Sequence, residues 1–199
     1  MVERSAEDER RQVFDRLFAD GADPWGFETS DYERAKFDAT IAALGDRRFG
    51  HALEIGCAFG VLSERLAVRC GRLTALDVSG VAVTRALERA GASGFAKRAR
   101  FLRAEVPGEW PAGCYDLVVL SEVLYFLDPH EVDAVARLCA RDLAPDGTCL
   151  VVNWTGANDR PLDGNAAARR FLAGLGALRR GANDTHRADG YRLDVWEAR

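Results

Sequence analysis

The chain has 199 residues, a formal net charge of −4 and 48% hydrophobic residues, so we expect one globular domain with a buried core. Basic and acidic residues are interspersed and no apolar segment approaches the roughly 20 residues that cross a bilayer, which disfavours nucleic-acid and membrane partners. The charged N-terminus lacks the apolar part of a secretory signal, and we expect a cytoplasmic protein. The five cysteines form no CxxC pair, which favours free thiols and no metal.

Two helices are predicted before the first strand. Residues 5–20 form a helical pattern with Ser5 as a possible cap. Its apolar residues share one face at a spacing of four, first Val13 and Leu17, and with them Phe14 and Phe18. A segment rich in Gly, Pro and Asp follows, and residues 30–45 predict a second helix that begins at Ser30 or Asp31.

From residue 51 onward, strand and helix patterns alternate. Strands are predicted at 51–56, 72–78, 99–106, 115–122, 147–154 and 191–198. Helices are predicted at 60–71, 79–91, 128–143 and 165–176, with a turn at 144–147. Several strands are continuous apolar runs, as in a parallel sheet whose two faces are both covered by helices. The alternation predicts an α/β fold with right-handed crossovers.

The loop after the first predicted strand is a candidate ligand site, because ligands bind at the carboxyl ends of strands in such sheets. Its sequence, Gly56 to Gly60 and onward, excludes a phosphate-binding Walker A loop, since Val61 stands where a Lys is required. A dinucleotide fingerprint would need glycines where Ala58 and Val61 stand. Both phosphate-bearing ligand classes are therefore disfavoured.

The same loop resembles motif I of class I methyltransferases, which bind S-adenosylmethionine. Glu54, Gly56, Ala58 and Gly60 match its acidic and glycine positions. The resemblance implies that Glu54 faces the methionyl ammonium, and that the methyl of Ala58 is tolerated if its φ is negative. Asp77 ends the next strand and would accept both ribose hydroxyls. A fold without a cofactor, in which the two acids cap helices, stays open. Further cofactor contacts are expected from Cys57 and Val78.

Two more strand ends complete the predicted site. In class I methyltransferases the third strand end contacts adenine, which implies this role for Ala104, Glu105 and Val106. The alternative is that Glu105 is a solvated surface acid.

The sequence YDLVVLSEVLYFLDP resembles the fourth strand of these enzymes and places Ser121 and Glu122 at the reactive end of the cofactor. We expect Glu122 to accept the proton of an amine nucleophile or to attract the cationic amine. Tyr125 would bond the amine or form an aromatic wall. The alternative is that Glu122 binds only a backbone amide.

The segments 23–45, 52–63 and 106–128, with the C-terminal YRLDVWEAR, resemble the nodulation-type N-methyltransferase family. That family methylates the free amine of a partly deacetylated chitooligosaccharide. The resemblance implies a Rossmann-like fold with a seven-stranded, mostly parallel sheet and helices on both faces. It implies a single methyltransferase domain over 1–199, with a helical lid and cap at 1–48 and the core at 49–199.

In this family the N-terminal segment closes over the cofactor. By resemblance, Trp25, Tyr32, Arg34 and Lys36 are the candidate lid residues. Tyr32 and Lys36 lie four residues apart and should share a helix face. The alternative for Trp25 is core packing.

The implied activity is S-adenosylmethionine-dependent N-methylation of an amino sugar or related small amine of specialised metabolism, such as antibiotic biosynthesis. The acceptor is then a small molecule, and the chain a monomer or homodimer. The family tends to carry histidines where this chain has Asn153 and Ala168, two positions expected to face the acceptor. O-methylation of a small metabolite and cofactor binding without catalysis stay open as alternatives.

Overall fold

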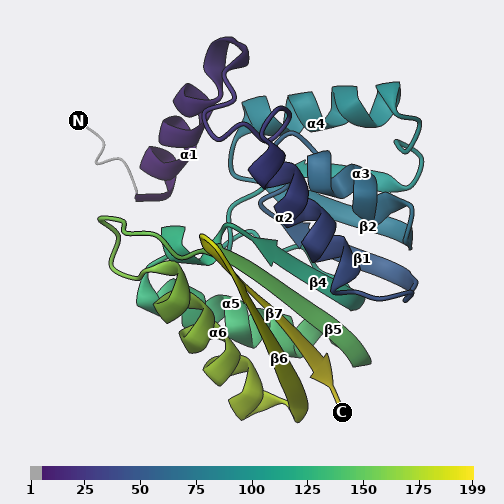
Figure 1. The fold of residues 1–199 in the computed structure, drawn as a ribbon, viewed down its shortest axis with the longest axis vertical. Helices are drawn as coiled ribbons and strands as arrows, with labels where there is room; N and C mark the ends of the chain where they lie inside the picture. Colours follow the sequence, from purple (N-terminus) through teal and green to yellow (C-terminus); the bar gives the residue numbers. More distant parts are fainter. Residues whose placement is uncertain (1–5) are drawn as a thin grey trace.

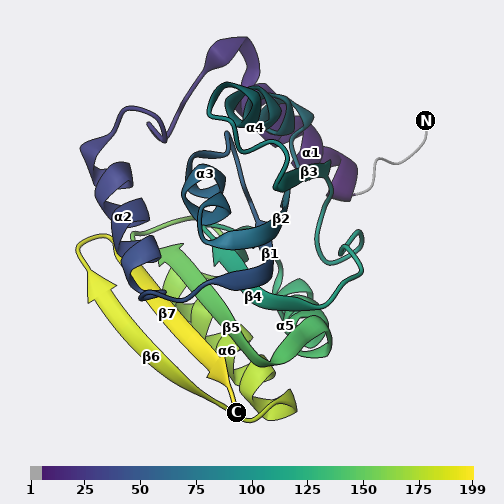
Figure 2. The ribbon, with the colours of Figure 1, turned by 90° about the vertical axis from the view of Figure 1, so that its right-hand side faces the viewer.

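The computed structural model describes residues 6–199, so the predicted cap Ser5 lies outside the described residues. It contains one seven-stranded sheet, in the order β3-β2-β1-β4-β5-β7-β6, with helices on both faces (Figures 1 and 2). The strands are β1 (Phe49–Ile55), β2 (Cys70–Asp77), β3 (Ala99–Arg103), β4 (Tyr115–Ser121), β5 (Leu143–Trp154), β6 (Gly181–Ala188) and β7 (Tyr191–Ala198). The α-helices are α1 (Ala6–Leu17), α2 (Asp31–Ala42), α3 (Val61–Ala67), α4 (Gly80–Ala92), α5 (Pro129–Asp142) and α6 (Gly164–Leu178). Short 3₁₀ turns are η1 (Ala19–Gly21) and η2 (Leu124–Phe126).

The predicted α/β fold with a mostly parallel sheet is confirmed. Strands β3, β2, β1, β4 and β5 run parallel, and β7 pairs antiparallel with both β5 and β6. The strand order reverses between β1 and β4, which places a ligand crevice at their carboxyl ends. Strand β6 had no sequence signal, because it is an edge strand without a single buried residue and so shows no apolar alternation.

Several element boundaries differ from those predicted; for example, β2 begins at Cys70, inside the helix expected at 60–71. Strand β3 ends at Arg103, so Glu105 lies in the loop after it. The expected turn at 144–147 lies within β5, which begins at Leu143. The pairing of β5 with β4 shifts register across this stretch, so the extra residues bulge out of the ladder. The turn residues at 144–147 correctly indicated irregular backbone. The prediction that they precede the strand was wrong, because they lie within β5.

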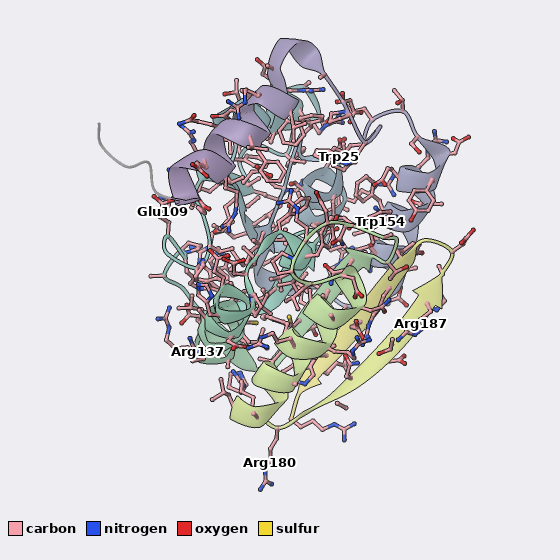
Figure 3. The ribbon with its side chains drawn as sticks, turned by 90° about the vertical axis from the view of Figure 1, so that its left-hand side faces the viewer. Trp25, Glu109, Arg137, Trp154, Arg180 and Arg187 are labelled. Carbon is pink, nitrogen blue, oxygen red and sulfur yellow. The ribbon has the colours of Figure 1, made fainter. Side chains whose placement is uncertain are left out.

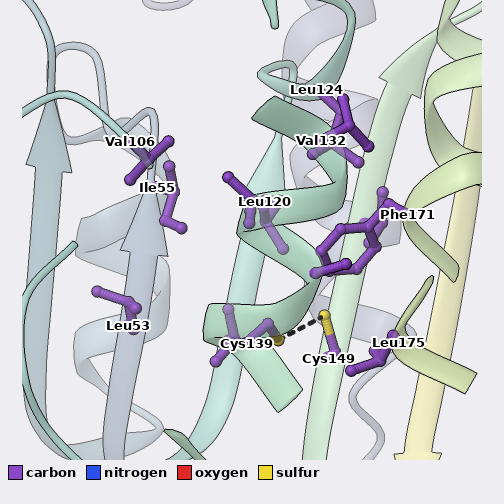
Figure 4. Close-up of a cluster of buried hydrophobic side chains, with 14 of the residues drawn as sticks. Leu53, Ile55, Val106, Leu120, Leu124, Val132, Cys139, Cys149, Phe171 and Leu175 are labelled. Atoms are coloured by element: carbon purple, nitrogen blue, oxygen red, sulfur yellow. Dashed lines mark hydrogen bonds between the residues drawn. The ribbon is translucent and has the colours of Figure 1, made fainter. Parts of the chain in front are cut away.

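Alternate residues of the central strands supply two hydrophobic clusters, one on each face of the sheet. Leu53 and Ile55 pack toward α5 and α6, whereas Ala52 packs toward α2, α3 and α4. Figure 4 shows the first cluster, in which the thiols of Cys139 and Cys149 approach to 3.8 Å. All five cysteines are free thiols. Within residues 6–199, no helix combines the length and the apolar character that crossing a membrane requires.

Helix α1 stands apart from both helical layers and lies beside the carboxyl ends of the strands (Figure 1). Only part of its predicted apolar face packs inward. Phe14 and Phe18 pack inward, while Val13 and Leu17 are 38% and 39% exposed. The two pairs are one position apart, or about 100° around the helix, and the heavier aromatic pair takes the buried face.

Phe171→Ala tests the core between β5 and α6. Phe171 is fully buried, so we expect a loss of about 3–5 kcal/mol in the free energy of unfolding, measured by urea denaturation. Leu178→Ala on the same helix is the control, since Leu178 is 55% exposed and should change stability by less than about 1 kcal/mol. Equal losses in the two variants would contradict the packing described.

Candidate functional site

A cavity of about 430 Å³ lies at the carboxyl ends of the strands, between the sheet and the N-terminal segment. Its walls come from the loops after β1, β2, β3 and β4, and from α1 and α2. Most residues predicted from the sequence line it: Trp25, Tyr32, Lys36, Gly56, Cys57, Ala58, Asp77, Val78, Ala104, Glu105, Val106, Ser121, Glu122 and Tyr125. Glu54 and Gly60 lie behind this wall rather than in it.

The loop between β1 and α3 needs its first and last glycines. Gly56 has φ +79°, and a Cβ there would lie 2.4 Å from Cγ2 of Val123. Gly60 has φ +75°, and a Cβ there would approach Ala86 to 3.2 Å. The loop therefore passes close under its neighbours because these residues have no side chain.

Ala58 adopts φ +44°, so the expectation of a negative φ was wrong. A left-handed conformation costs a non-glycine residue about 1–2 kcal/mol. The N–H of Ala58 donates to Oδ2 of Asp77 at 2.9 Å, a hydrogen bond to a buried carboxylate that offsets this cost. The middle of the loop is thus shaped by an acid on β2 rather than by a glycine.

Asp77 is fixed at the cavity wall by backbone amides. Its Oδ1 accepts from the N–H of Ser79 at 2.9 Å, beside the bond that Oδ2 accepts from Ala58. Burial raises the pKa of Asp77 to about 6, against the effect of these amides. Each carboxylate oxygen has two lone pairs, so both can still accept from a ligand hydroxyl.

Glu54 is 1% exposed and lies behind the loop. Its Oε2 accepts from the hydroxyl of Ser63 at 2.5 Å, while Oε1 has no hydrogen-bond partner among the described residues. Burial raises the pKa of Glu54 to about 7. A buried carboxylate with one unpaired oxygen suits a cationic partner, but Glu54 does not line the cavity, so its contact with the cofactor ammonium stays a prediction.

Glu105 is 5% exposed, so the alternative of a solvated surface acid was wrong. Arg10 and Arg11 of α1 contact its two oxygens at 2.7 and 3.2 Å. Arg10 also contacts Glu131 of α5 at 2.8 Å. The carboxylate expected at adenine therefore holds α1 across the cavity.

Helix α1 supplies cavity residues that the sequence analysis missed. Arg10, Phe14 and Phe18 all line the cavity and follow each other at intervals of four, a spacing that could have identified them. The ring of Phe14 packs against Phe126 at 5.1 Å, and the ring of Phe18 packs against Phe59 at 4.9 Å. These edge-to-face contacts close the cavity with aromatic groups.

The loop after α1 brings Trp25 to the cavity. Its ring lies 5.5 Å from that of Phe18, yet 41% of its surface is exposed, so it forms part of the rim rather than of the core. Trp154, at the end of β5, also lines the cavity and is 37% exposed. Figure 3 shows both tryptophans toward the same end of the molecule.

A buried charge cluster joins α2 to the end of β4. Nζ of Lys36 contacts Oε1 of Glu122 at 2.7 Å and Oε1 of Glu33 at 2.9 Å. Burial alone would lower the pKa of Lys36, but the two carboxylates outweigh it and the net effect is a rise. The ring of Tyr32 lies 5.3 Å from Nζ, which confirms that Tyr32 and Lys36 share a helix face.

Glu122 accepts from the hydroxyl of Tyr125 and from the backbone N–H of Trp154, both at 2.8 Å. The alternative that it binds only a backbone amide was therefore wrong. Its own φ is +59°, a left-handed conformation that costs a non-glycine residue about 1–3 kcal/mol and is typical of functional sites.

Three expected positions do not reach the cavity. Arg34 is exposed and pairs with Asp31 at 2.8 Å. Asn153 is fully buried on the α6 side of β5, and Ala168 is packed in the core beside it. Since neighbouring strand residues face opposite ways, it is Trp154 that turns toward the cavity. Among residues 6–199 there is no group of three His, Cys, Asp or Glu side chains that could hold a metal.

Gly56→Ala tests the loop. The added methyl meets Val123 and the left-handed backbone, so we expect binding of S-adenosylhomocysteine, measured by calorimetry, to weaken at least tenfold. Gly91→Ala is the control, because it lies in α4 with nothing within 4 Å and should leave binding unchanged. Unchanged binding in Gly56→Ala would contradict the role of this loop.

The buried acids predict a pH dependence. Burial raises the pKa of Glu54 from its ordinary 4.5 to about 7 and that of Asp77 from 3.8 to about 6. The folded chain therefore holds more protons in this range, and their contribution to stability is lost as the pH rises from about 4 to 7. We expect a smaller fall in the melting temperature between pH 5 and 8 for Glu54→Gln than for the unmodified chain, by about 2–4 °C per kcal/mol removed. Parallel melting curves would show that Glu54 does not titrate as described.

Comparison with known proteins places the chain among methyltransferase folds. Residues 6–157 match the family model of nodulation protein S (NodS). Nodulation protein S of Bradyrhizobium diazoefficiens is 34% identical over 146 residues, covering 72% of this chain and 68% of that protein. A putative methyltransferase from Pseudomonas syringae is 35% identical with a TM-score of 0.68, covering 83% of this chain and 98% of that chain.

The crystal structure of the N-methyltransferase NodS from Bradyrhizobium japonicum WM9, in complex with S-adenosyl-L-homocysteine, superposes with a TM-score of 0.75. The alignment covers 94% of this chain and 97% of that one, at 24% identity. At this identity the likeness shows a shared fold.

Proposed function

This chain belongs to the nodulation protein S family, and on that basis we propose that it is an S-adenosylmethionine-dependent N-methyltransferase whose acceptor is a small amine, in the first place an amino sugar. The cofactor supplies a methyl group activated by a positively charged sulfur. The residues of this chain must then bind that cofactor, admit the acceptor, exclude water and remove a proton.

The observation that carries the proposal is the charge of the cluster at the end of β4. Two carboxylates, Glu33 and Glu122, surround the one ammonium of Lys36 inside a largely aromatic cavity. With both carboxylates ionised, the cluster carries one uncompensated negative charge. A buried charge is costly unless it is paired, so such a site favours a cationic acceptor over a neutral one.

The other end of the cavity has the groups that the cofactor requires. The glycine loop would hold the methionyl part, with Glu54 buried behind the loop and Asp77 beside the ribose hydroxyls. Ala104 and Val106 form apolar wall at the expected adenine position, and both are less than 10% exposed. We assign the carboxylate of Glu105 to holding α1 over this end rather than to contacting adenine.

At the reactive end we assign two residues to the acceptor. Glu122 has three hydrogen-bond donors on its two oxygens, which leaves one lone pair to take the proton of the amine. Tyr125 fixes that carboxylate through its hydroxyl and forms part of the wall. Helices α1 and α2 cover the site, and excluding water strengthens these electrostatic contacts.

An amino-sugar acceptor suits the rim of the cavity. Trp154 presents a half-exposed ring there, and Arg160 stacks over Phe126 at 5.1 Å. A sugar offers both an apolar ring face and hydroxyls to such a mixed surface. Asn153 and Ala168, which stand where the family tends to carry histidines, do not line the cavity. The absence of these histidines therefore does not argue against an amino-sugar acceptor. Specialised metabolism, such as antibiotic biosynthesis, is the setting we propose.

The direct test uses three matched acceptors with S-adenosylmethionine: glucosamine, N-acetylglucosamine and glucose. Methyl transfer, followed by mass spectrometry, should occur to glucosamine and not to the other two, because only glucosamine carries an ammonium. Transfer to a hydroxyl group in all three would indicate an O-methyltransferase instead.

Glu122→Gln tests the proton acceptor. We expect kcat for the amine acceptor to fall about 100-fold or more, as for loss of a general base, with the affinity for S-adenosylhomocysteine unchanged. Glu88→Gln on the exposed side of α4 removes the same charge away from the cavity and should leave kcat unchanged. An unaltered kcat in Glu122→Gln would exclude the role in proton transfer.

A further inference from the structure

The two carboxylates bound to Lys36 are unequally engaged. Glu122 accepts from Lys36, from Tyr125 and from the N–H of Trp154. Glu33 accepts from Lys36 alone, on Oε1. Its Oε2 is buried and has no hydrogen-bond partner among residues 6–199. Glu33 therefore has more unused hydrogen-bond acceptor positions than Glu122.

Glu33 lies in the wall of the cavity, with its Oε2 buried. It lies in the first turn of α2, lines the cavity and is 6% exposed. Burial raises the pKa of Glu33, and the ammonium of Lys36 lowers it by a smaller amount. Its charged form is thus only partly compensated in the ligand-free chain, and a second cation would stabilise it.

The position of Glu33 relative to Glu122 suggests which cation this is. One oxygen of each carboxylate contacts the same Nζ atom of Lys36, at 2.9 and 2.7 Å, so the two acids lie close enough to share one small ligand. An ammonium has three N–H donors and can use several acceptors at once. The ammonium of Lys36 lies between the two acids and offsets part of their mutual repulsion.

We propose that Glu33 docks the acceptor, its carboxylate accepting a hydrogen bond from the ammonium of the amine, while Glu122 beside it takes the proton. This inference rests on the proposed N-methyltransferase function and adds a specificity-determining residue to it. A neutral hydroxyl acceptor gains no ion pair with Glu33, so the residue favours amines over alcohols at the binding step.

The test separates binding from turnover. With glucosamine as the acceptor, Glu33→Gln should raise KM about 10- to 100-fold and change kcat less than about threefold, since the ion pair forms before the chemical step. Glu33→Asp, which keeps the charge on a shorter side chain, should recover part of the affinity. Asp31→Asn is the control, because it removes a charge from the same helical turn at a side chain that is 90% exposed.

Cofactor affinities measured by calorimetry show whether Glu33 binds a cationic group of the cofactor instead of the acceptor. The inference predicts unchanged affinities of Glu33→Gln for S-adenosylmethionine and S-adenosylhomocysteine. If both bind more weakly, Glu33 holds the methionyl ammonium that they share. If only S-adenosylmethionine binds more weakly, Glu33 faces the sulfonium. Either result overturns the assignment to the acceptor.

Binding of glucosamine to the chain saturated with S-adenosylhomocysteine distinguishes failure of the role of Glu33 from failure of the proposed function. If the unmodified chain binds glucosamine and Glu33→Gln binds it equally well, the inference about Glu33 fails and the proposed function stands. If the unmodified chain neither binds nor methylates glucosamine but methylates a hydroxyl acceptor, the proposed function fails, and the inference fails with it.

Discussion

The ion pair between Lys36 and Glu122 is the contact on which the arrangement of the site depends. It joins α2, in the N-terminal segment, to the residue that leaves β4 at the switch point of the sheet. Without the ammonium, Glu33 and Glu122 would place two negative charges side by side in an apolar cavity, which is unfavourable. With it, this repulsion is partly offset and α2 is fixed against the core. The lysine therefore serves the local structure and the electrostatics of the cavity together.

The same segment closes the other end of the cavity through α1. Asp15 accepts from the hydroxyl of Ser79 at 2.6 Å and contacts Arg103 at 2.9 Å, while Arg10 reaches both Glu105 and Glu131. These contacts span loops that follow β2 and β3 and the start of α5. Because most of them are partly exposed ion pairs, each is weak individually. In the proposed function, such a cover would exclude water while closed and would open for exchange of cofactor and product.

The fold was largely predictable because its central strands are buried on both faces and therefore consist of continuous runs of apolar residues. The edge strand β6 has no buried residues and left no such pattern. Positions set by the sheet, such as Asp77 and Glu122, were found because a strand end fixes where its next residue goes. Contacts made by α1 were harder to predict, since the rotation of a surface helix depends on what it packs against. Of the four apolar residues expected on one face, Phe14 and Phe18 pack inward, whereas Val13 and Leu17 are exposed.

Long-range partners were also beyond the sequence pattern. Glu33 became notable only because its Oε2 lacks a partner in a buried position, which no local spacing reveals. Likewise, nothing in the motif indicated that Glu105 would bind two arginines nearly 100 positions earlier in the chain. Residue type and strand position predict a polar site, but the distribution of its hydrogen bonds requires the folded chain.

The backbone at Ala58 bears on how such loops diverge. A glycine usually adopts such a left-handed conformation. Here Ala58 adopts it, stabilised by a hydrogen bond to the carboxylate of Asp77, nineteen positions later on β2. An acid at the end of β2 thus allows alanine at the middle of this loop at a modest energetic cost. A search that requires three glycines would miss this chain, whereas a pattern that pairs the loop with the distant acid would find it.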